Sequence, residues 1–218
     1  MNKSFKCILF DLDGTIIDSG PDLLDSLNYT LFKENLGNID KNVVGSLVGG
    51  GAKAMIEKAL EHLNKQISEK KLELMISNFL KFYYKNCSNK SKLYKNVIYT
   101  LQKLKPNFKI GLCTNKKQHL TEKIIRDYKI QKYFDFVLGS SANLKLKPNI
   151  EMLEFSIKKL NCDAIHTVMV GDSENDILPA QALGMTSVFV SYGYGKIKKS
   201  IEPNFIIEEF REVCKILN

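Results

Sequence analysis

The chain has 218 residues, 44% hydrophobic and 26% charged, a length and balance that support a full hydrophobic core and argue against a disordered or fibrous chain. Its formal net charge is +8, but the lysines are spread along the chain, and the short basic cluster at residues 196–199 has no interleaved aromatic residues to stack on bases. We therefore expect a solvated basic surface and no nucleic acid partner, with attraction of a small anionic substrate as the alternative.

Neither a membrane span nor an export signal is expected. The first apolar run, residues 7–10, stops at Asp11, and no stretch approaches the roughly 20 apolar residues that cross a bilayer. The five cysteines are odd in number and scattered, without the spacing of a zinc site or a disulfide framework. We expect reduced thiols, a cytoplasmic location and no membrane partner, in either a monomer or a homodimer.

The first predicted strand, residues 5–10, is followed by a long stretch that contains no convincing strand before residue 109. Apolar residues recur there at helical spacing over residues 23–32, 54–63 and 72–84. An ordinary crossover between parallel strands is much shorter, so this stretch predicts an inserted module. We expect an α/β catalytic core over residues 1–15 and 92–218 and an all-helical cap over residues 16–91.

After the insertion, short apolar runs rich in Val, Ile and Phe predict buried parallel strands. They lie at residues 109–113, 134–138, 167–170, 187–190 and 205–207, and helical patterns separate the earlier ones at residues 119–128 and 152–160. This alternation predicts an α/β fold, with a doubly wound, Rossmann-like parallel sheet as the core.

Four polar signatures lie close after predicted strands. DLDGT (residues 11–15) follows the first strand, CTN (residues 113–115) ends the second, Lys147-Pro148 lies in the loop after the third, and GDSEND (residues 171–176) follows the fourth. The carboxyl ends of parallel strands share one edge of the sheet, where open α/β sheets bind ligands. We therefore expect the four signatures to converge, with the inserted module above them.

The carboxylates in these signatures predict a metal-assisted phosphate site. Asp11, Asp13 and Asp172 would place about −3 of formal charge in one pocket, and an all-oxygen cluster favours Mg²⁺. Residues i and i+2 of an extended strand point the same way, so Asp11 and Asp13 can flank one substrate. We assign Asp11 as the nucleophile that attacks phosphorus and Asp13 as the acid that protonates the leaving oxygen.

Donors to the phosphate are expected from the same edge. Gly14 permits a close backbone turn whose N–H groups face the phosphate. Thr114, Asn115 and Lys147 would supply a hydroxyl, an amide and an ammonium group. Thr114 and Asn115 have an alternative role as an N-cap pair that begins the next helix.

With these motifs in this order, the chain resembles phosphatases of the haloacid dehalogenase superfamily that carry an inserted helical cap. The resemblance covers essentially the whole chain. It implies that Asp11 is the nucleophile, that Asp13 is the acid/base, and that Thr114 and Lys147 contact the phosphate. It also implies that Asp11, the Asp13 carbonyl and Asp172 hold Mg²⁺, with Asp176 and Ser173 as supporting residues. Asp176 has an alternative role as a cap of the following helix.

The third motif departs from the superfamily pattern in one position. Members often have a second proline two residues after the first, and this chain has Ile150 there. Pro148 and Leu153 keep their places, so Lys147 remains the expected phosphate-binding amine, with Lys145 as the second candidate.

A narrower similarity concerns the substrate. The stretches DSGPDL (residues 18–23) and VGGGAK (residues 48–53) are similar to phosphoglycolate phosphatases, which implies hydrolysis of 2-phosphoglycolate to glycolate and phosphate. Asp13 favours phosphate esters, because superfamily members that cleave carbon–halogen bonds lack this residue. Gly50 and Lys53 become candidate cap contacts to the substrate carboxylate, with a solvated helical Lys53 as the alternative.

Other readings of the same motifs remain open. A pyrophosphatase or a nucleotide or sugar-phosphate phosphatase of the same superfamily would share these residues. From a different class, a signalling receiver that accepts phosphate on an aspartate also combines carboxylates, a Thr and a Lys on an α/β sheet. The inserted module and the first-strand nucleophile argue against a receiver.

Overall fold

The computed structural model describes residues 4–141 and 143–217, which form two compact units. The first unit contains the chain up to Asp18 and again from Leu93, and the second contains Ser19–Lys92. Two short strands, β2 (Ile17–Asp18) and β3 (Lys92–Leu93), form a two-stranded sheet at the junctions between the units in the sequence. None of the described helices is long and apolar enough to cross a membrane.

Six strands form the sheet of the first unit, in the order β5-β4-β1-β6-β7-β8. They are β1 (Cys7–Phe10), β4 (Lys109–Lys117), β5 (Phe136–Ser140), β6 (Thr167–Gly171), β7 (Thr186–Val190) and β8 (Phe205–Ile207). Every neighbouring pair is parallel. Phe10, the last residue of β1, lies opposite Val170, one residue before the end of β6, and opposite Leu112 of β4, so the residues that follow these three positions lie at one edge of the sheet. The predicted parallel α/β fold is confirmed.

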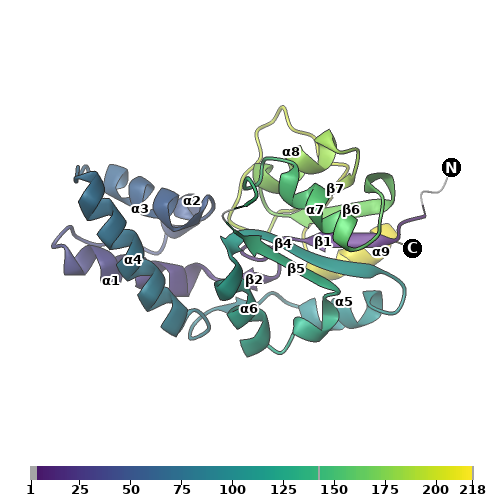
Figure 1. Cartoon of the computed structure of the whole chain (residues 1–218), viewed down its shortest axis with the longest axis horizontal. Coiled ribbons are helices and arrows are strands. Elements are labelled where there is room, and N and C mark those ends of the chain that lie inside the picture. Colours follow the sequence, from purple (N-terminus) through teal and green to yellow (C-terminus); the bar gives the residue numbers. More distant parts are fainter. Residues whose placement is uncertain (1–3, 142, 218) are drawn as a thin grey trace. The chain divides into compact units, whose positions relative to one another are not determined.

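Helices cover both faces of this sheet (Figure 1). They are α5 (Val97–Leu104), α6 (Gln118–Asp127), α7 (Glu151–Lys159), α8 (Glu174–Ala182) and α9 (Val213–Leu217), with 3-10 turns at Gln131–Tyr133, Ala164–His166 and Phe210–Glu212. Alternate residues of β1 point to opposite faces: Cys7 and Leu9 join a core cluster with Met152 of α7 and Ala180 of α8. On the other face Phe10 packs on Phe210, with ring centroids 5.2 Å apart. This packing on both faces fixes the position of β1, and therefore of the residues that follow its C-terminal end.

Three features of the core differ from the sequence prediction. β4 extends through Lys117, where a strand ending at residue 113 was expected. Its register against β5 shifts between Cys113, opposite Leu138, and Lys117, opposite Ser140, so the intervening residues bulge from the regular ladder. The other two features, helix α5 and the pair β2 and β3, were not predicted. β2 and β3 have two residues each, too few for a detectable period.

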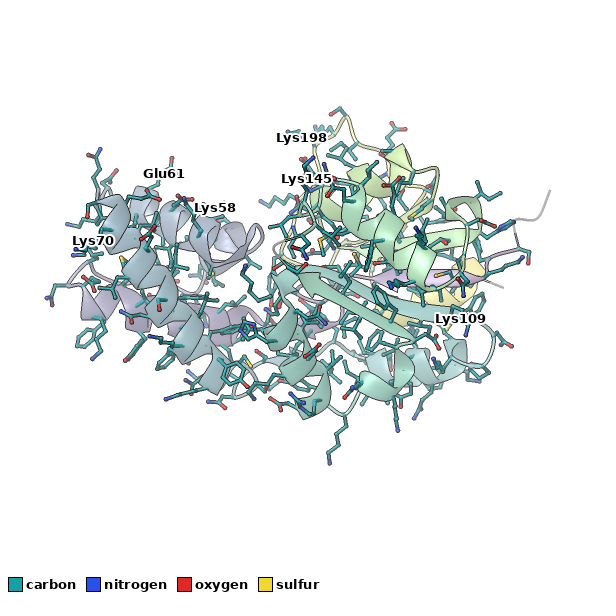
Figure 2. All side chains as sticks on the ribbon, viewed as in Figure 1. Lys58, Glu61, Lys70, Lys109, Lys145 and Lys198 are labelled. Atoms are coloured by element: carbon teal, nitrogen blue, oxygen red, sulfur yellow. The ribbon has the colours of Figure 1, made fainter. Side chains whose placement is uncertain are left out.

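The second unit is built from helices, as Figure 1 shows for its purple and blue segments. They are α1 (Gly20–Lys33), α2 (Val44–Leu47), α3 (Gly51–His62) and α4 (Glu69–Asn86). The long helices α1 and α4 pack together, and Tyr29 stacks on Phe82 with ring centroids 4.0 Å apart. Lysines are exposed on both units, including Lys58 and Lys109 (Figure 2). The expected basic surface is therefore present.

Asp22 ties the first turn of α1 to the end of the second unit. Its buried carboxylate accepts hydrogen bonds from the main-chain N–H of Lys90 (2.9 Å) and of Ser91 (2.8 Å) and from the Ser91 hydroxyl (2.6 Å). These bonds join residues nearly seventy positions apart in the sequence. Asp22, one residue of the DSGPDL stretch, therefore has a structural role in this unit.

We expect Asp22→Ala to lower the free energy of unfolding by about 2–4 kcal/mol, because it leaves buried N–H and O–H donors without an acceptor. Chemical denaturation followed by far-UV circular dichroism measures this effect. Asp25→Ala is the matched control, since the Asp25 carboxylate is 42% exposed and pairs only with the flexible Lys90 ammonium group at 2.6 Å. Equal losses for the two variants would contradict this role for Asp22.

Candidate active site

Asp11 and Asp172 lie side by side because they follow neighbouring strands. The Asp11 N–H donates to the Val170 carbonyl (2.9 Å), which extends the β1–β6 ladder by one bond beyond Phe10. Asp172 follows Gly171, the last residue of β6. Both carboxylates are buried, and one oxygen from each lies within 4.8 Å of the other and of an Asp176 oxygen. The predicted convergence of the first and fourth signatures is therefore present.

Lys147 reaches this carboxylate cluster from the loop after β5. Its Nζ donates to Asp11 Oδ1 (2.9 Å), Asp176 Oδ1 (2.5 Å) and the Cys113 carbonyl (2.6 Å). Burial alone would lower the pKa of Lys147, but the charges of Asp11 and Asp176 more than offset this and raise it. The amine therefore stays an ammonium ion. Lys145, the second candidate, points away: its side chain is 74% exposed and pairs with Glu151 at 3.1 Å (Figure 2).

Asp176 has two roles in the structure. Its Oδ2 accepts hydrogen bonds from the N–H (3.2 Å) and the hydroxyl (3.0 Å) of Ser173, the residue before α8. Its Oδ1 accepts the Lys147 ammonium group. The alternative of helix capping is therefore correct for Asp176, and the same carboxylate also positions the lysine. Ser173 contributes to the cluster through Asp176.

The cluster carries more negative charge than its lysine balances. Burial, followed by the charge of Asp176 and opposed by Lys147, raises the pKa of Asp11 to about 6. Burial and the charges of Asp176 and Asp11 raise the pKa of Asp172 to about 7, against hydrogen bonds from two main-chain N–H groups. Raised carboxylate pKa values mark a place where a cation would be stabilising. Oxygen ligands of this kind suit Mg²⁺, so the residues fit the expected metal.

A loop after β7 holds Asp172 in place, and the sequence analysis missed it. Asp172 Oδ2 accepts hydrogen bonds from the N–H groups of Tyr194 (2.8 Å) and Gly195 (3.0 Å). A Cβ atom at Gly193 would lie 2.3 Å from Asp172 Cβ, and one at Gly195 would lie 2.2 Å from the Asp172 carbonyl oxygen. Only glycine allows this approach. The alternating glycines of SYGYG (residues 191–195) were the available signal.

Two tyrosines anchor the same loop to the segment after β1. The Tyr192 hydroxyl donates to the Thr15 carbonyl (2.8 Å), and the Tyr194 hydroxyl bonds to Asp18 Oδ1. The Tyr192 ring also packs on Tyr94, with centroids 4.6 Å apart. Asp172 is thus oriented by a loop that is fixed at several points, which preorganises its carboxylate before any ligand arrives.

Gly14 has a second reason to be glycine besides the backbone turn that was expected. Its φ is +79°, and a Cβ atom there would lie 2.0 Å from Asp172 Oδ2. Its own N–H donates to the Ile17 carbonyl (2.9 Å), within the turn that follows β1. Gly14 also allows the first and fourth signatures to approach each other closely.

Asn115 and Thr114 lie within β4, not at the start of a helix. α6 begins at Gln118, so the alternative of an N-cap pair is wrong. The Asn115 side chain exchanges two hydrogen bonds with the main chain of Lys147, at 2.8 and 2.9 Å. These two bonds position the Lys147 loop, and the phosphate contact expected of Asn115 stays a prediction. The Thr114 side chain is buried, and its Oγ1 accepts the Lys116 N–H at 3.3 Å.

Lys116 is a second amine at the site, which the sequence analysis did not identify. Its Nζ donates to both carboxylate oxygens of Asp13, at 2.8 and 2.7 Å, and its side chain is only 5% exposed. Lys116 lies two residues after Thr114, in the stretch of β4 whose register against β5 shifts. A lysine this close to a predicted phosphate-binding threonine was the available signal in the sequence.

The expected cap contacts lie in the second unit. Gly49, Gly50 and Gly51 all have positive φ, from +78° to +100°, which makes a glycine-dependent turn before α3. Lys53, in the first turn of α3, is 55% exposed and lies 3.4 Å from Glu69 Oε1 and 3.8 Å from Glu57 Oε1. These contacts describe a solvated surface lysine, the alternative role given above.

We expect the metal-free protein to lose stability as the pH rises from about 4 to about 7. The folded-state pKa values of Asp11 and Asp172, about 6 and about 7, exceed the ordinary value of 3.8. The folded state therefore holds protons in this range that the unfolded chain has released, and this stabilisation disappears as the two groups ionise. At about 1.4 kcal/mol per pKa unit, each of the two groups contributes a few kcal/mol.

Urea denaturation in the presence of a chelator, at several pH values, measures this dependence. Asp172→Asn is the comparison variant and should flatten the profile between about pH 4 and about pH 7. Mg²⁺ should oppose the loss, because it binds the ionised carboxylates and stabilises the folded state. Parallel profiles for the wild type and Asp172→Asn in chelator would contradict the raised pKa values.

Comparison with known proteins identifies the class to which this fold and site belong. Residues 8–190, most of the chain, match the family model described as haloacid dehalogenase-like hydrolase. The chain therefore belongs to the haloacid dehalogenase-like hydrolases, and the resemblance inferred from its motifs is confirmed. A signalling receiver does not fit a chain that matches a hydrolase family over this length.

Similar proteins extend over the whole chain. A phosphoglycolate phosphatase of Colwellia psychrerythraea is 34% identical and covers 95% of each chain, and one of Haemophilus influenzae is 33% identical over the full length of both. The crystal structure of a predicted phosphoglycolate phosphatase from Haemophilus somnus superposes with a TM-score of 0.92, at 30% identity over all of both chains. The expectation that the chain is an enzyme of the phosphatase type is confirmed.

Proposed function

We propose that this enzyme is a Mg²⁺-dependent phosphatase of small phosphorylated metabolites, with 2-phosphoglycolate as its preferred substrate. The observation that carries the proposal is the buried juxtaposition of Asp11, Asp172 and Lys147 at the carboxyl end of β1. The Lys147 Nζ lies 2.9 Å from Asp11, and oxygens of Asp11 and Asp172 lie within 4.8 Å of each other. The names of the full-length relatives support 2-phosphoglycolate.

Asp11 is the proposed nucleophile. Its carboxylate oxygen attacks phosphorus, and the bond from phosphorus to the ester oxygen breaks, which leaves the phosphoryl group on Asp11. Lys147 holds Asp11 in place and supplies positive charge beside the attacking oxygen. Mg²⁺, bound by Asp11, Asp172 and the Asp13 carbonyl, would neutralise charge on the phosphoryl group and the carboxylates. Thr114 completes the proposed phosphate contacts.

Asp13 handles the protons in both steps. Protonated Asp13 gives its proton to the leaving ester oxygen, which departs as an alcohol. The Asp13 carboxylate then takes a proton from a water molecule that attacks the phosphoryl group on Asp11. This step releases inorganic phosphate and restores the free Asp11 carboxylate and the protonated Asp13. The two carboxylates thus complete a cycle without any other proton carrier.

The second unit, Ser19–Lys92, is the proposed cap, and its role is to exclude bulk water while the phosphoenzyme exists. Gly50 and Lys53 stay candidate contacts to the substrate within it. A cytoplasmic location is part of the same proposal, since all five cysteines are free thiols and three of them are buried.

A panel of phosphorylated metabolites assayed with Mg²⁺ tests the proposal. The panel contains 2-phosphoglycolate, inorganic pyrophosphate, nucleoside monophosphates and sugar phosphates, so it also tests the alternative phosphatases. We expect the highest kcat/KM for 2-phosphoglycolate and loss of turnover in excess chelator. Turnover that persists without divalent metal would refute the metal role, and a clear preference for another member of the panel would refute the substrate.

A further inference from the structure

Lys116 is unexpected at this site, because the proposed mechanism already has a lysine. The two amines are divided between the two proposed catalytic carboxylates. Lys147 bonds to Asp11, the proposed nucleophile, whereas Lys116 bonds to both oxygens of Asp13, the proposed acid. Lys147 is therefore placed where the phosphoryl group is attacked, and Lys116 is placed where the leaving group departs.

Lys116 is buried, so its ammonium group needs defined partners. Its side chain is 5% exposed, and an ammonium ion out of water must be held by anionic or strongly polar partners. The bulge in β4 between Cys113 and Lys117 carries this residue, and its N–H bonds to the Thr114 hydroxyl at 3.3 Å. The β4 backbone thus fixes Lys116 beside Asp13, unlike the exposed Lys117 that follows it.

The distances bring the Lys116 ammonium group close to the leaving oxygen that Asp13 would protonate. An acid must approach the oxygen it protonates to about 2.6–3.2 Å, and Lys116 Nζ lies 2.7 Å from Asp13 Oδ2. Lys116 Nζ is then within roughly 6 Å of the ester oxygen of a bound substrate. A carboxylate on the neighbouring carbon, or the second phosphate of a pyrophosphate, is close enough to the ester oxygen to reach the Lys116 ammonium group across this separation.

We infer that Lys116 is a specificity-determining residue that selects substrates whose leaving group carries an anionic charge close to the scissile bond. The inference rests on the proposed function and deepens it. An anion on the leaving group forms a charge-assisted hydrogen bond with the buried ammonium group, and this contact is strong because water is excluded. A substrate with a neutral leaving group gains no such contact with Lys116.

Three substrates separate this contact from general damage to the site. The leaving group of 2-phosphoglycolate carries a carboxylate, and that of pyrophosphate is itself a phosphate. The leaving group of 2-hydroxyethyl phosphate is neutral, and this substrate is nearly the same size as 2-phosphoglycolate. Each is assayed with Mg²⁺ on the wild type, Lys116→Met, Lys116→Arg and the control Lys117→Met. Ratios of kcat/KM between substrates are independent of the fraction of each preparation that is folded.

We expect Lys116→Met to lower kcat/KM for an anionic leaving group by about 10–100-fold more than for 2-hydroxyethyl phosphate, with part of the selectivity kept in Lys116→Arg. Lys117→Met should leave the ratio unchanged. The anionic substrate with the larger selective loss identifies carboxylate or phosphate as the recognised group. Equal losses for all three substrates would overturn the inference while the proposed function stands. A wild type that hydrolyses none of them would overturn both.

Discussion

Replacing Asp11 by Asn is expected to reduce kcat by at least about 10⁴-fold and to abolish the covalent phosphoenzyme. The amide is nearly the same size as the carboxylate but is a very poor nucleophile, and loss of a nucleophile typically costs about 10⁴–10⁶-fold in rate. Steady-state kinetics with 2-phosphoglycolate measures the loss. Rapid acid quenching after incubation with ³²P-labelled substrate measures the phosphoenzyme.

The fold of Asp11→Asn should survive, because the substitution removes one charge from a crowded buried cluster of carboxylates. Asp163→Asn is the matched control, since the Asp163 side chain is 82% exposed and only approaches His166 at 3.8 Å. That variant should keep full turnover and the labelled intermediate. A labelled protein or residual turnover above about 1% in Asp11→Asn would rule out Asp11 as the nucleophile.

Replacing Lys147 by Met should lower both the stability and the turnover of the enzyme. The substitution leaves Asp11 and Asp176 buried without their ammonium partner, and removal of one member of a buried ion pair typically costs about 3–5 kcal/mol. We expect a loss of roughly 3 kcal/mol in the free energy of unfolding in chelator at neutral pH. Turnover should fall by about 10²–10³-fold even when the variant is folded.

Lys145→Met is the matched control, because Lys145 is two residues away but has an exposed side chain paired with Glu151. It should leave both denaturation and kinetics close to the wild type. The pair of variants also decides between the two amines that the third motif offers. A folded Lys147→Met enzyme with normal turnover, or a greater loss in Lys145→Met, would contradict the assignment.

The position of the site followed from local patterns in the sequence. The apolar run that ends at Asp11 and the run that ends before Asp172 have the length and residue types of buried parallel strands. Carboxyl ends of such strands meet at one edge in any doubly wound sheet. The proximity of Asp11 and Asp172 could therefore be predicted without knowing how the intervening chain folds.

The protein partners of individual polar side chains were not predicted, because each partner is distant in the sequence. Asn115 has the donors to bind phosphate, but β4 and the Lys147 loop place it against the Lys147 main chain. Gly14 suits a phosphate-binding turn, but its missing side chain is needed for the approach of Asp172. The residue type shows whether a side chain can donate or accept a hydrogen bond. The fold decides which partner is close enough to form that bond.

The contacts of Lys116 and of the SYGYG loop could not be predicted from local sequence patterns. Lys116 lies two residues after Thr114 in the sequence, but its pairing with Asp13 requires β1 and β4 to be neighbours. The loop after β7 reaches Asp172 through main-chain N–H groups, which any sequence possesses.

The sequence by itself therefore determined the parallel sheet, the helical insertion and the edge at which the acidic residues gather, since these depend on periodicity and chain direction. Only the tertiary structure decided which lysine faces which carboxylate, because those pairings depend on strand order and join residues more than a hundred positions apart. It also decided what holds Asp172, because the loop after β7 reaches that carboxylate through main-chain N–H groups, which carry no sequence signal.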